Sequence, residues 1–586
     1  MIGSLFNWEE TAPDRYLVDH LAGVLDLPEP LARTLVNRGI TTAVAAERFL
    51  NPQQDDMHDP GLFRDMEKAV GRIVSALKDH QRILILGDYD VDGITGTALL
   101  ISFLRGRGGH VNYYIPNRIK EGYGLSVDVV EKAHKAKYDL IITVDTGISA
   151  IEEARAATAL GMDVIVTDHH EPHDDTPDVF AILNPKLADA TYPFRDLAGV
   201  GVAFKLALAL AEYLGMDHEE VMNEYIELAA LGTVADLAPL LDENRYMVRR
   251  GLAGMTRSRN PGLYSLLKVS HIKEEDRMDT MHVGFRLAPR INAAGRLWKP
   301  RAGVELFLET NPDKARLLAE KLDEHNRLRV HEEAKILESA LKRLEESGDP
   351  GKDGVIFLHD DKWHVGVIGI VASKIMERYH RPVLLATESQ RPVDAQNPHP
   401  ERGRIFQGSA RSFREFDLYA GLSECSDILL SYGGHKLAAG LKIYEKDIPE
   451  LKRRLGELAS GAVGGGDFRR SITLDADVSL SSITLDLARK FRSLEPCGVG
   501  NRRPVLRARA ATVLKSYSCG PDGGVLKLKL GQGNAVRDAV GFGKSEIFDP
   551  EKLYGRQVDV VFDLQEDNYA GRKKVGLKII DLKENL

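Results

Sequence analysis

Three aspartates stand at every second position, directly after a short run of aliphatic residues. The segment Arg82–Gly93 reads RILILGDYDVDG and carries Asp88, Asp90 and Asp92. Alternate side chains of a strand share a face, so these carboxylates are expected to converge where the strand ends. Three carboxylates at such short distances repel one another and raise one another's pKa values. This arrangement favours a bound cation over a solvated acidic turn.

Two further apolar runs also end in an aspartate, and in one of them two histidines follow it. KYDLIITVDTGIS leads to Asp145, and GMDVIVTDHHEPH leads to Asp168, His169 and His170. Helical segments separate the runs, and this alternation predicts βαβ units and a parallel sheet. Strands that are buried on both faces read as continuous apolar runs, as these do. Because parallel strands connected in this way end on one edge, the acidic clusters are expected to meet there.

A fourth acid, Asp236, lies in the Ala/Leu-rich segment IELAALGTVADLAPL, where a helix cap explains it as well as a metal ligand does. The full set of candidate ligands is too large for one metal ion and suits two: Asp88, Asp90, Asp92, Asp145, His169, His170 and Asp236. A mixed carboxylate and imidazole set favours Mn²⁺, with Mg²⁺ as the second choice. Two such ions assist in-line displacement at phosphorus. The predicted chemistry is metal-assisted hydrolysis of a phosphate ester or anhydride.

Four motifs, GDYDVDG, VDTGIS, TDHHEP and GTVADLAPL, resemble in this order those of the DHH phosphoesterase superfamily. Five later segments are similar to its RecJ branch, the bacterial single-strand-specific exonucleases: PRINAAGR, WHVGVIGIVASKI, GSARS, GGHKLAAG and LEPCGVGNRRPVL. The resemblance covers roughly residues 45–510. It implies stepwise 5′-to-3′ hydrolysis of single-stranded DNA to mononucleotides, in DNA repair and recombination.

The resemblance also implies roles for the candidate residues. The expected metal ligands are Asp90, Asp92, Asp145, His169 and Asp236, with Asp145 bridging two ions. The expected catalytic side chains beside them are Asp88, Asp168, His170, Arg296 and His435. Either direct ligation or orientation of ligands fits Asp88 and Asp168. Either ligation or contact with the scissile phosphate fits His170.

An end-specific nuclease also needs groups that hold the terminal phosphate. By resemblance Arg118, Ser409 and Arg411 are expected to hold a 5′ phosphate, since a guanidinium grips phosphate in a bidentate manner. Gly433 and Gly434 are expected to form a tight turn whose backbone N–H groups approach an anion. Arg290, beside INAAG, is a further substrate-binding candidate. The alternative for any single arginine is a surface ion pair.

Two other functions compete with this interpretation. One is a DHH phosphodiesterase that acts on very short oligonucleotides or cyclic dinucleotides, which would need neither a long connector nor a strand-binding barrel. The other is a non-catalytic DNA-binding protein on a decayed fold, which is expected to lack metal ligands. Every motif position in this chain holds a competent ligand. The exonuclease is therefore the predicted function.

The predicted fold class is α/β, with a parallel-sheet DHH catalytic domain and a second α/β, DHH-associated domain joined by a long helix. Short alternating strands after about residue 466 predict a C-terminal OB-like β-barrel, a fold that binds single strands by groove charge and stacking. The expected divisions are an N-terminal extension (1–45), the catalytic domain (46–300), the connecting helix (301–350), the substrate-binding domain (351–462) and the barrel (463–586).

The composition indicates what class of protein this is and in which compartment it works. The chain has 586 residues, of which 43% are hydrophobic, as expected for several globular domains. No signal peptide is apparent, and the most apolar stretch is interrupted by Lys205 and Glu212, so no membrane association is expected. Three scattered cysteines fit a reducing cytoplasm and exclude a zinc ribbon. A single-strand-binding protein and a helicase are partners implied by the resemblance.

The net charge of −9 requires any DNA-binding surface to be local. Residues 489–515 are the candidate, with eight basic residues against one acid. Their density and arginine bias modestly favour a surface that binds the DNA backbone over a solvated charged face. Their positions are Arg489, Lys490, Arg492, Arg502, Arg503, Arg507, Arg509 and Lys515.

Overall fold

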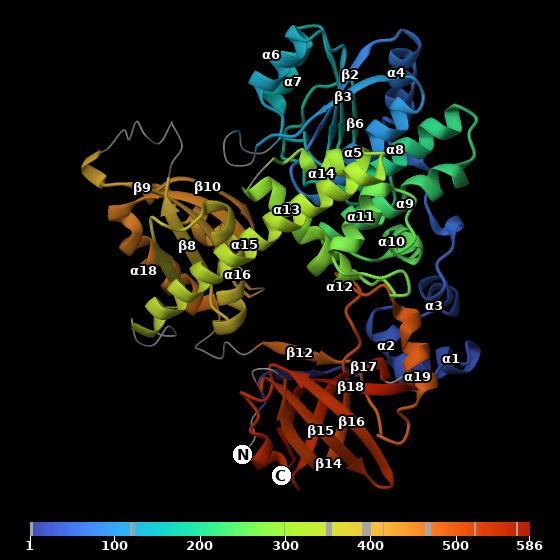
Figure 1. The fold of residues 1–586 in the computed structure, drawn as a ribbon, viewed down its shortest axis with the longest axis vertical. Coiled ribbons are helices and arrows are strands. Elements are labelled where there is room, and N and C mark those ends of the chain that lie inside the picture. Colours follow the sequence, from blue (N-terminus) through green and yellow to red (C-terminus); the bar gives the residue numbers. More distant parts are fainter. Residues whose placement is uncertain are drawn as a thin grey trace.

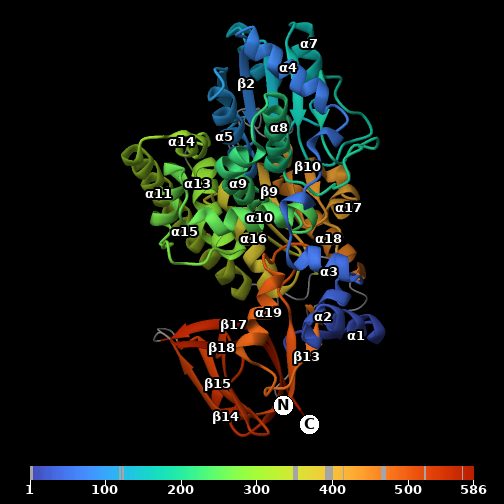
Figure 2. The same cartoon turned by 90° about the vertical axis from the view of Figure 1, so that its right-hand side faces the viewer.

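The protein is described by a computed structural model that covers residues 4–117, 121, 124–297, 299–346, 354–389, 400–413, 415–462, 470–520, 523–569 and 572–585. Figure 1 shows three lobes: the catalytic lobe at the top, a second α/β lobe at the left and a barrel at the bottom. Figure 2 shows that the barrel also stands apart from the other lobes when the view is turned. The three predicted kinds of domain are therefore confirmed, while their limits stay a prediction.

The catalytic lobe is built on a five-stranded parallel sheet in the order β3-β2-β4-β5-β6, which confirms the predicted topology. Its strands are β2 (Arg82–Gly87), β3 (His110–Tyr114), β4 (Leu140–Val144), β5 (Asp163–Thr167) and β6 (Ala181–Leu183). One face packs against α4 (Met66–Lys78), α5 (Val91–Arg105) and α8 (Gly199–Tyr213). The other face packs against α6 (Val127–Lys135) and α7 (Ile151–Ala159). Since helices cover both faces, every residue of β4 is buried, which explains its uninterrupted apolar sequence.

A helical layer lies between the sheet and the connector. It comprises α9 (His218–Ala235), α10 (Asp242–Met255), α11 (Pro261–Val269), α12 (Thr280–His282), α13 (Ala288–Leu297) and α14 (Ala302–Leu308). The predicted long connecting helix is α15 (Pro312–Glu346). It starts at a proline, which is well suited to the first turn of a helix.

The second lobe has a five-stranded sheet in the order β10-β11-β9-β8-β7. Its strands are β7 (Ile356–His359), β8 (Val383–Glu388), β9 (Ile405–Arg411), β10 (Leu429–His435) and β11 (Ala438–Tyr444). Helix α16 (Val365–Tyr379) covers one face, and α17 (Leu418–Ser423) and α18 (Ile448–Ala462) cover the other. Only β7 and β8 pair in parallel, so this sheet is mostly antiparallel. Of the polar loop at 389–407, residues 390–399 lie outside the described residues.

The C-terminal lobe is the predicted barrel. Its strands are β13 (Ala476–Asp477), β14 (Leu506–Cys519), β15 (Val525–Gln532), β16 (Ala535–Phe542), β17 (Gln557–Tyr569) and β18 (Arg572–Glu584). Pairing of β14 with both β15 and β17 closes the sheet on itself. The short helices α19 (Leu485–Phe491) and α20 (Pro550–Leu553) complete the lobe.

The N-terminal segment packs on the C-terminal barrel, and Figure 1 shows the two chain ends side by side. Helices α1 (Arg15–Val24), α2 (Glu29–Asn37) and α3 (Ala43–Leu50) share the barrel's apolar core. Strand β1 (Asn7–Glu10) pairs in parallel with β12 (Ser471–Leu474). The fully buried carboxylate of Asp581 accepts hydrogen bonds from the backbone of Leu5 and the indole of Trp8. The residues predicted as an extension are therefore integral to the barrel lobe.

Across the described ranges, none of the helices combines the length and apolar character that a membrane crossing requires.

Candidate metal centre

The carboxyl ends of the parallel strands bring the predicted acids and histidines together. Chain leaving β2 carries Asp88, Asp90 and Asp92, chain leaving β4 carries Asp145, and chain leaving β5 carries Asp168, His169 and His170. Asp236 caps the C-terminal end of α9 and also reaches the same cluster. The helix-cap interpretation of Asp236 is therefore confirmed, and its role as a metal ligand stays a prediction.

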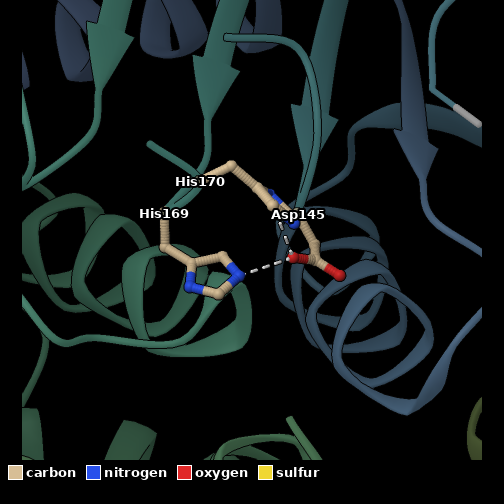
Figure 3. Close-up of side chains that lie close together, drawn as sticks. All are labelled: Asp145, His169 and His170. Carbon is tan, nitrogen blue, oxygen red and sulfur yellow. Dashed lines mark ion pairs between the residues drawn. The ribbon is translucent and has the colours of Figure 1, made fainter. Parts of the chain in front are cut away.

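The cluster divides into overlapping sets whose potential ligand atoms lie within 4.8 Å of one another. These sets are Asp92–His169–Asp236, Asp88–Asp90–Asp145 and Asp145–His169–His170. Asp145 and His169 each belong to two of the sets, and the bridging role of Asp145 stays a prediction. Figure 3 shows His169 and His170 pointing toward the Asp145 carboxylate. Oxygen-rich sets with one or two imidazoles match the donors that Mn²⁺ and Mg²⁺ accept.

Asp92 is held by the N-terminus of α8. Its two carboxylate oxygens accept hydrogen bonds of 2.7 Å from the backbone N–H groups of Gly199 and Val200. A helix N-terminus stabilises negative charge. Nevertheless, burial and then the charges of Asp236 and Asp90 raise the pKa of Asp92 well above its usual value. A divalent cation would offset this cost.

His169 presents an unprotonated nitrogen to three carboxylates. Its Nε2 atom lies 3.0 Å from Asp145 Oδ1, 3.7 Å from Asp92 Oδ2 and 3.8 Å from Asp236 Oδ2. Burial lowers the pKa of the ring to about 3, and its backbone hydrogen bond to Leu197 leaves Nε2 as the lone-pair nitrogen. Within the described chain this buried atom makes no hydrogen bond. A nitrogen lone pair that faces carboxylate oxygens suits a shared cation, so the residues fit a metal.

Asp168 orients the two histidines. Its Oδ1 atom accepts from the backbone N–H of His169 at 2.7 Å and lies 2.7 Å from His170 Nδ1, while Oδ2 accepts from Ile148 N–H. Burial lowers the pKa of His170, but the hydrogen bond to Asp168 outweighs it, and the net pKa rises to about 9. His170 is therefore protonated at neutral pH when no ion is bound. The sequence left two roles open for Asp168, direct ligation of a metal and orientation of the ligands. These bonds favour orientation.

Asp145 adopts a backbone conformation that suits few residues. Its φ angle is 60°, in the left-handed region where Asp and Asn are tolerated best among residues with a side chain. A Cβ atom at Gly199 would stand 2.6 Å from Asp145 Cβ, so only glycine fits opposite it. Strain of this kind clusters at functional sites. Burial, followed by the charge of Asp92, raises the pKa of Asp145 well above its usual range.

A cavity of about 800 Å³ separates the metal centre from the edge strand β10. Asp168 and His170 line it from the catalytic lobe, and His435 lines it from the second lobe. Gly433 and Gly434 also line it but lie in β10, so the predicted tight turn is wrong: the hairpin turns at 436–437. Hydrogen bonding to β11 holds them in the strand.

Two tyrosines in the cavity wall were missed from the sequence. Tyr419 of α17 and Tyr432 of β10 stand with ring centroids 5.8 Å apart. They lie 13 residues apart in unrelated segments, and no sequence pattern marked them. Leu197, Gly199 and Val200 were missed for a similar reason, because their backbone groups, not their side chains, contact the ligands.

Ser409 and Arg411 lie on strand β9, not in the predicted small-residue loop. Arg411 donates to Ser409 Oγ at 3.0 Å, and both side chains rest against Gly369 in the first half of α16. The predicted anion-binding role of this pair stays a prediction.

The remaining arginine candidates differ in their surroundings. Arg296 donates to the carbonyl of Gly366 at the start of α16 and so joins the two lobes. Arg290 forms a 2.9 Å ion pair with Asp323 of α15 and is mostly buried, and the structure does not bring it to the cavity. Arg118 lies outside the described residues.

Much of the basic segment 489–515 forms ion pairs within the protein, and its role as a DNA-binding surface stays a prediction. Arg502 pairs with Asp475, Arg503 with Asp279, and Arg507 and Arg509 both pair with Asp477. Arg492 pairs with Glu566. Contact of these side chains with phosphate would first have to break these ion pairs.

Divalent cations are expected to stabilise this protein. Because the buried carboxylates repel one another without an ion, binding of Mn²⁺ adds stability by RT ln(1 + [L]/Kd), about 2.7 kcal/mol at 100 times Kd. A thermal melt should show a higher Tm with Mn²⁺ than with EDTA. Buffer with Na⁺ at equal ionic strength is the control, and equal Tm values in all three conditions would contradict a metal centre.

Comparison with known proteins agrees with this geometry. Residues 82–233 match the DHH family N-terminal domain, residues 352–461 match the DHHA1 domain, and residues 474–581 match the RecJ OB domain. The fold and the cluster thus define a DHH-type, metal-dependent phosphoesterase. The domain limits predicted at 45, 300, 350 and 462 stay predictions.

The relatives narrow this class to a family. The chain is 37% identical over 581 residues to the single-stranded-DNA-specific exonuclease RecJ of Bacillus subtilis (strain 168), covering 99% of this chain and 71% of that protein. A crystal structure of RecJ with Mn²⁺ from Thermus thermophilus superposes with a TM-score of 0.82 at 29% identity, covering 99% of this chain and 80% of that one. The corresponding Mg²⁺ complex gives 0.75 at 28% identity, with 99% and 79% coverage. The chain belongs to the RecJ family.

Proposed function

We propose that this protein is a single-stranded-DNA-specific exonuclease that removes mononucleotides from the 5′ end by two-metal phosphodiester hydrolysis, in DNA repair and recombination. The observation that carries the proposal is the cavity that sets His435 and the β10 edge opposite the Asp–His cluster. Family membership supports the substrate class, because the relatives are named single-stranded-DNA-specific exonucleases.

The ligand assignment follows the overlapping sets of the cluster. One Mn²⁺ or Mg²⁺ ion would be held by Asp92, His169 and Asp236, and a second by Asp88, Asp90 and Asp145. Asp145 Oδ1 also lies 3.0 Å from His169 Nε2, which suits the bridging role proposed for it. When bound, such ions polarise the phosphoryl group and lower the pKa of coordinated water. Asp168 serves as the orienting residue for both histidines.

The remaining roles belong to groups around the cavity. His170, held by Asp168, would donate a proton or hydrogen bond to the scissile phosphate from one side, and His435 would contact it from the other. Ser409 and Arg411, with Arg118, would hold the 5′ phosphate. Arg296 would keep α16 in place beside them through Gly366. Arg290 remains a substrate-binding candidate that would first have to leave Asp323.

The substrate, the partners and the cellular location are part of the same proposal. Single-stranded DNA is the substrate, and a single-strand-binding protein and a helicase are the proposed partners. The cytoplasmic location rests on the few, scattered cysteines, which a reducing compartment keeps as thiols.

Product analysis with Mn²⁺ tests this function. Immediate release of labelled mononucleotide from a 5′-labelled single strand, with gradual shortening of a 3′-labelled strand, is the expected result. A matched duplex should resist. Turnover of only a cyclic dinucleotide or very short oligonucleotides would instead assign the chain to the small-substrate phosphodiesterases.

A further inference from the structure

The first turn of α10 carries three consecutive buried polar residues: Glu243, Asn244 and Arg245. The first forms an ion pair with the buried Lys205, and the third donates to carbonyls of the barrel lobe. Asn244, between them, donates from Nδ2 to the backbone carbonyl of Asp196 at 2.7 Å and to that of Pro239 at 3.0 Å. An amide nitrogen has two N–H donors, and both are used here. Asn244 therefore bridges two chain segments that lie far apart in the sequence.

The first of these segments leads into α8 and holds two residues of the metal cluster. Asp196 lies just before the first turn of α8, whose backbone N–H groups donate to the two carboxylate oxygens of Asp92, each at 2.7 Å. The residue after it, Leu197, accepts a hydrogen bond from the His169 ring with its backbone carbonyl. The position of the Asp196 carbonyl therefore sets where Asp92 and His169 lie.

The second segment follows α9 and carries the third residue of the same ligand set. Asp236 caps the C-terminal end of α9, and the chain reaches Pro239 three residues later. Helices α8 and α9 touch beside these segments, since a Cβ atom at Gly232 would stand 2.7 Å from a side chain of α8 and 3.1 Å from Asp92 Oδ1. Packing this close transmits a displacement of either segment to the ligands. The Asn244 bridge thus spans the two segments on which the whole set depends.

We propose that Asn244 is a positioning residue of the metal centre. Its amide fixes the separation between the start of α8 and the end of α9, and so holds Asp92, His169 and Asp236 at the spacing that one ion needs. It acts through backbone carbonyls and not by contact with an ion or with DNA. Residues that orient metal ligands in this way typically raise metal affinity or activity about 10- to 100-fold. The assignment rests on the proposed function, which supplies the ligand set.

Removal of the bridge tests the positioning role. In Asn244→Ala one of the two Mn²⁺ ions should bind about 10- to 100-fold more weakly than in the wild type, as measured by the EPR signal of free Mn²⁺ during a titration. Cleavage of single-stranded DNA should lose kcat at limiting Mn²⁺, with KM for DNA unchanged, and should regain part of it in excess Mn²⁺. A residue that only stabilises the fold would lower Tm and leave the Mn²⁺ affinity of the folded protein unchanged.

Two further variants complete the test. Asn260 also bridges two elements of the catalytic lobe, since its Nδ2 atom donates to the Phe307 carbonyl at 2.8 Å, but α11 and α14, which it joins, carry none of the candidate ligands. Asn260→Ala should lower Tm without weakening Mn²⁺ binding. Asn244→Ser keeps one donor, should bind the affected ion with intermediate affinity, and carries the test if the alanine variant does not fold. Wild-type Mn²⁺ affinity in the folded Asn244 variants would overturn the proposal. If the wild type binds Mn²⁺ but does not cleave DNA, the proposed function fails while the titration still tests Asn244.

Discussion

Replacement of Asp145 by Asn should abolish hydrolysis and stabilise the metal-free protein. The amide removes the charge of one ligand set next to His169 of the other, whose Nε2 lies 3.0 Å from Asp145 Oδ1, so activity should fall at least about 1,000-fold. Asn also tolerates the φ of 60°, so the backbone is preserved. Because burial and Asp92 raise the pKa of the Asp145 carboxyl, an ionised carboxylate there costs folding free energy. Its loss should raise Tm by about 2–4 °C for each kcal/mol relieved.

The two effects can be measured on the same samples. Initial rates with Mn²⁺ report the chemistry, and thermal melts with EDTA and with Mn²⁺ report the stability. The Mn²⁺-induced rise in Tm should shrink in the variant. Asp26→Asn is a matched control, since Asp26 also has a positive φ of 50° but is fully exposed. Retained activity in Asp145→Asn would rule out the two-metal assignment.

Replacement of Arg245 by Lys should detach the barrel lobe from the catalytic lobe. Arg245 is almost fully buried in α10, and its guanidinium donates to five backbone carbonyls. These belong to Phe49, Ser493, Leu494, Glu495 and Pro496. Lysine has three donors and no planar fork, so carbonyls would stay unsatisfied. Buried polar groups without partners cost about 1–3 kcal/mol each.

Unfolding and proteolysis would show this uncoupling. We expect a loss of at least about 3 kcal/mol, a separate early transition and faster cleavage between residues 493 and 505. Burial lowers the pKa of Arg245 to about 9, so the buried charge itself costs folding free energy, which the hydrogen bonds to the carbonyls offset. Arg257→Lys, an exposed arginine just after the same helix, is the control. Wild-type stability in Arg245→Lys would show that the lobes are held mainly by other contacts.

The amino-acid sequence by itself determined the parallel sheet and the acidic cluster at its edge. Apolar runs that end in Asp88, Asp145 and Asp168 indicate both the strands and the acidic cluster. Buried parallel strands are uniformly apolar, and their carboxyl ends share one edge of the sheet. The class of metal followed from the donor types. These properties depend on residues close together in the chain, so local pattern was sufficient.

The tertiary structure decided the ion pairs and the strand register that join residues far apart in the chain. The sequence could not show that Arg507 and Arg509 form ion pairs with Asp477. Nor could it show the ion pair of Arg290 with Asp323, because these partners lie far apart in the chain. The placement of Gly433 opposite Gly440 likewise follows from strand register, which a one-residue slip would reverse. Only the folded chain distinguishes a glycine that the backbone needs, such as Gly434, from one whose added Cβ atom would have nothing within 4 Å, such as Gly433.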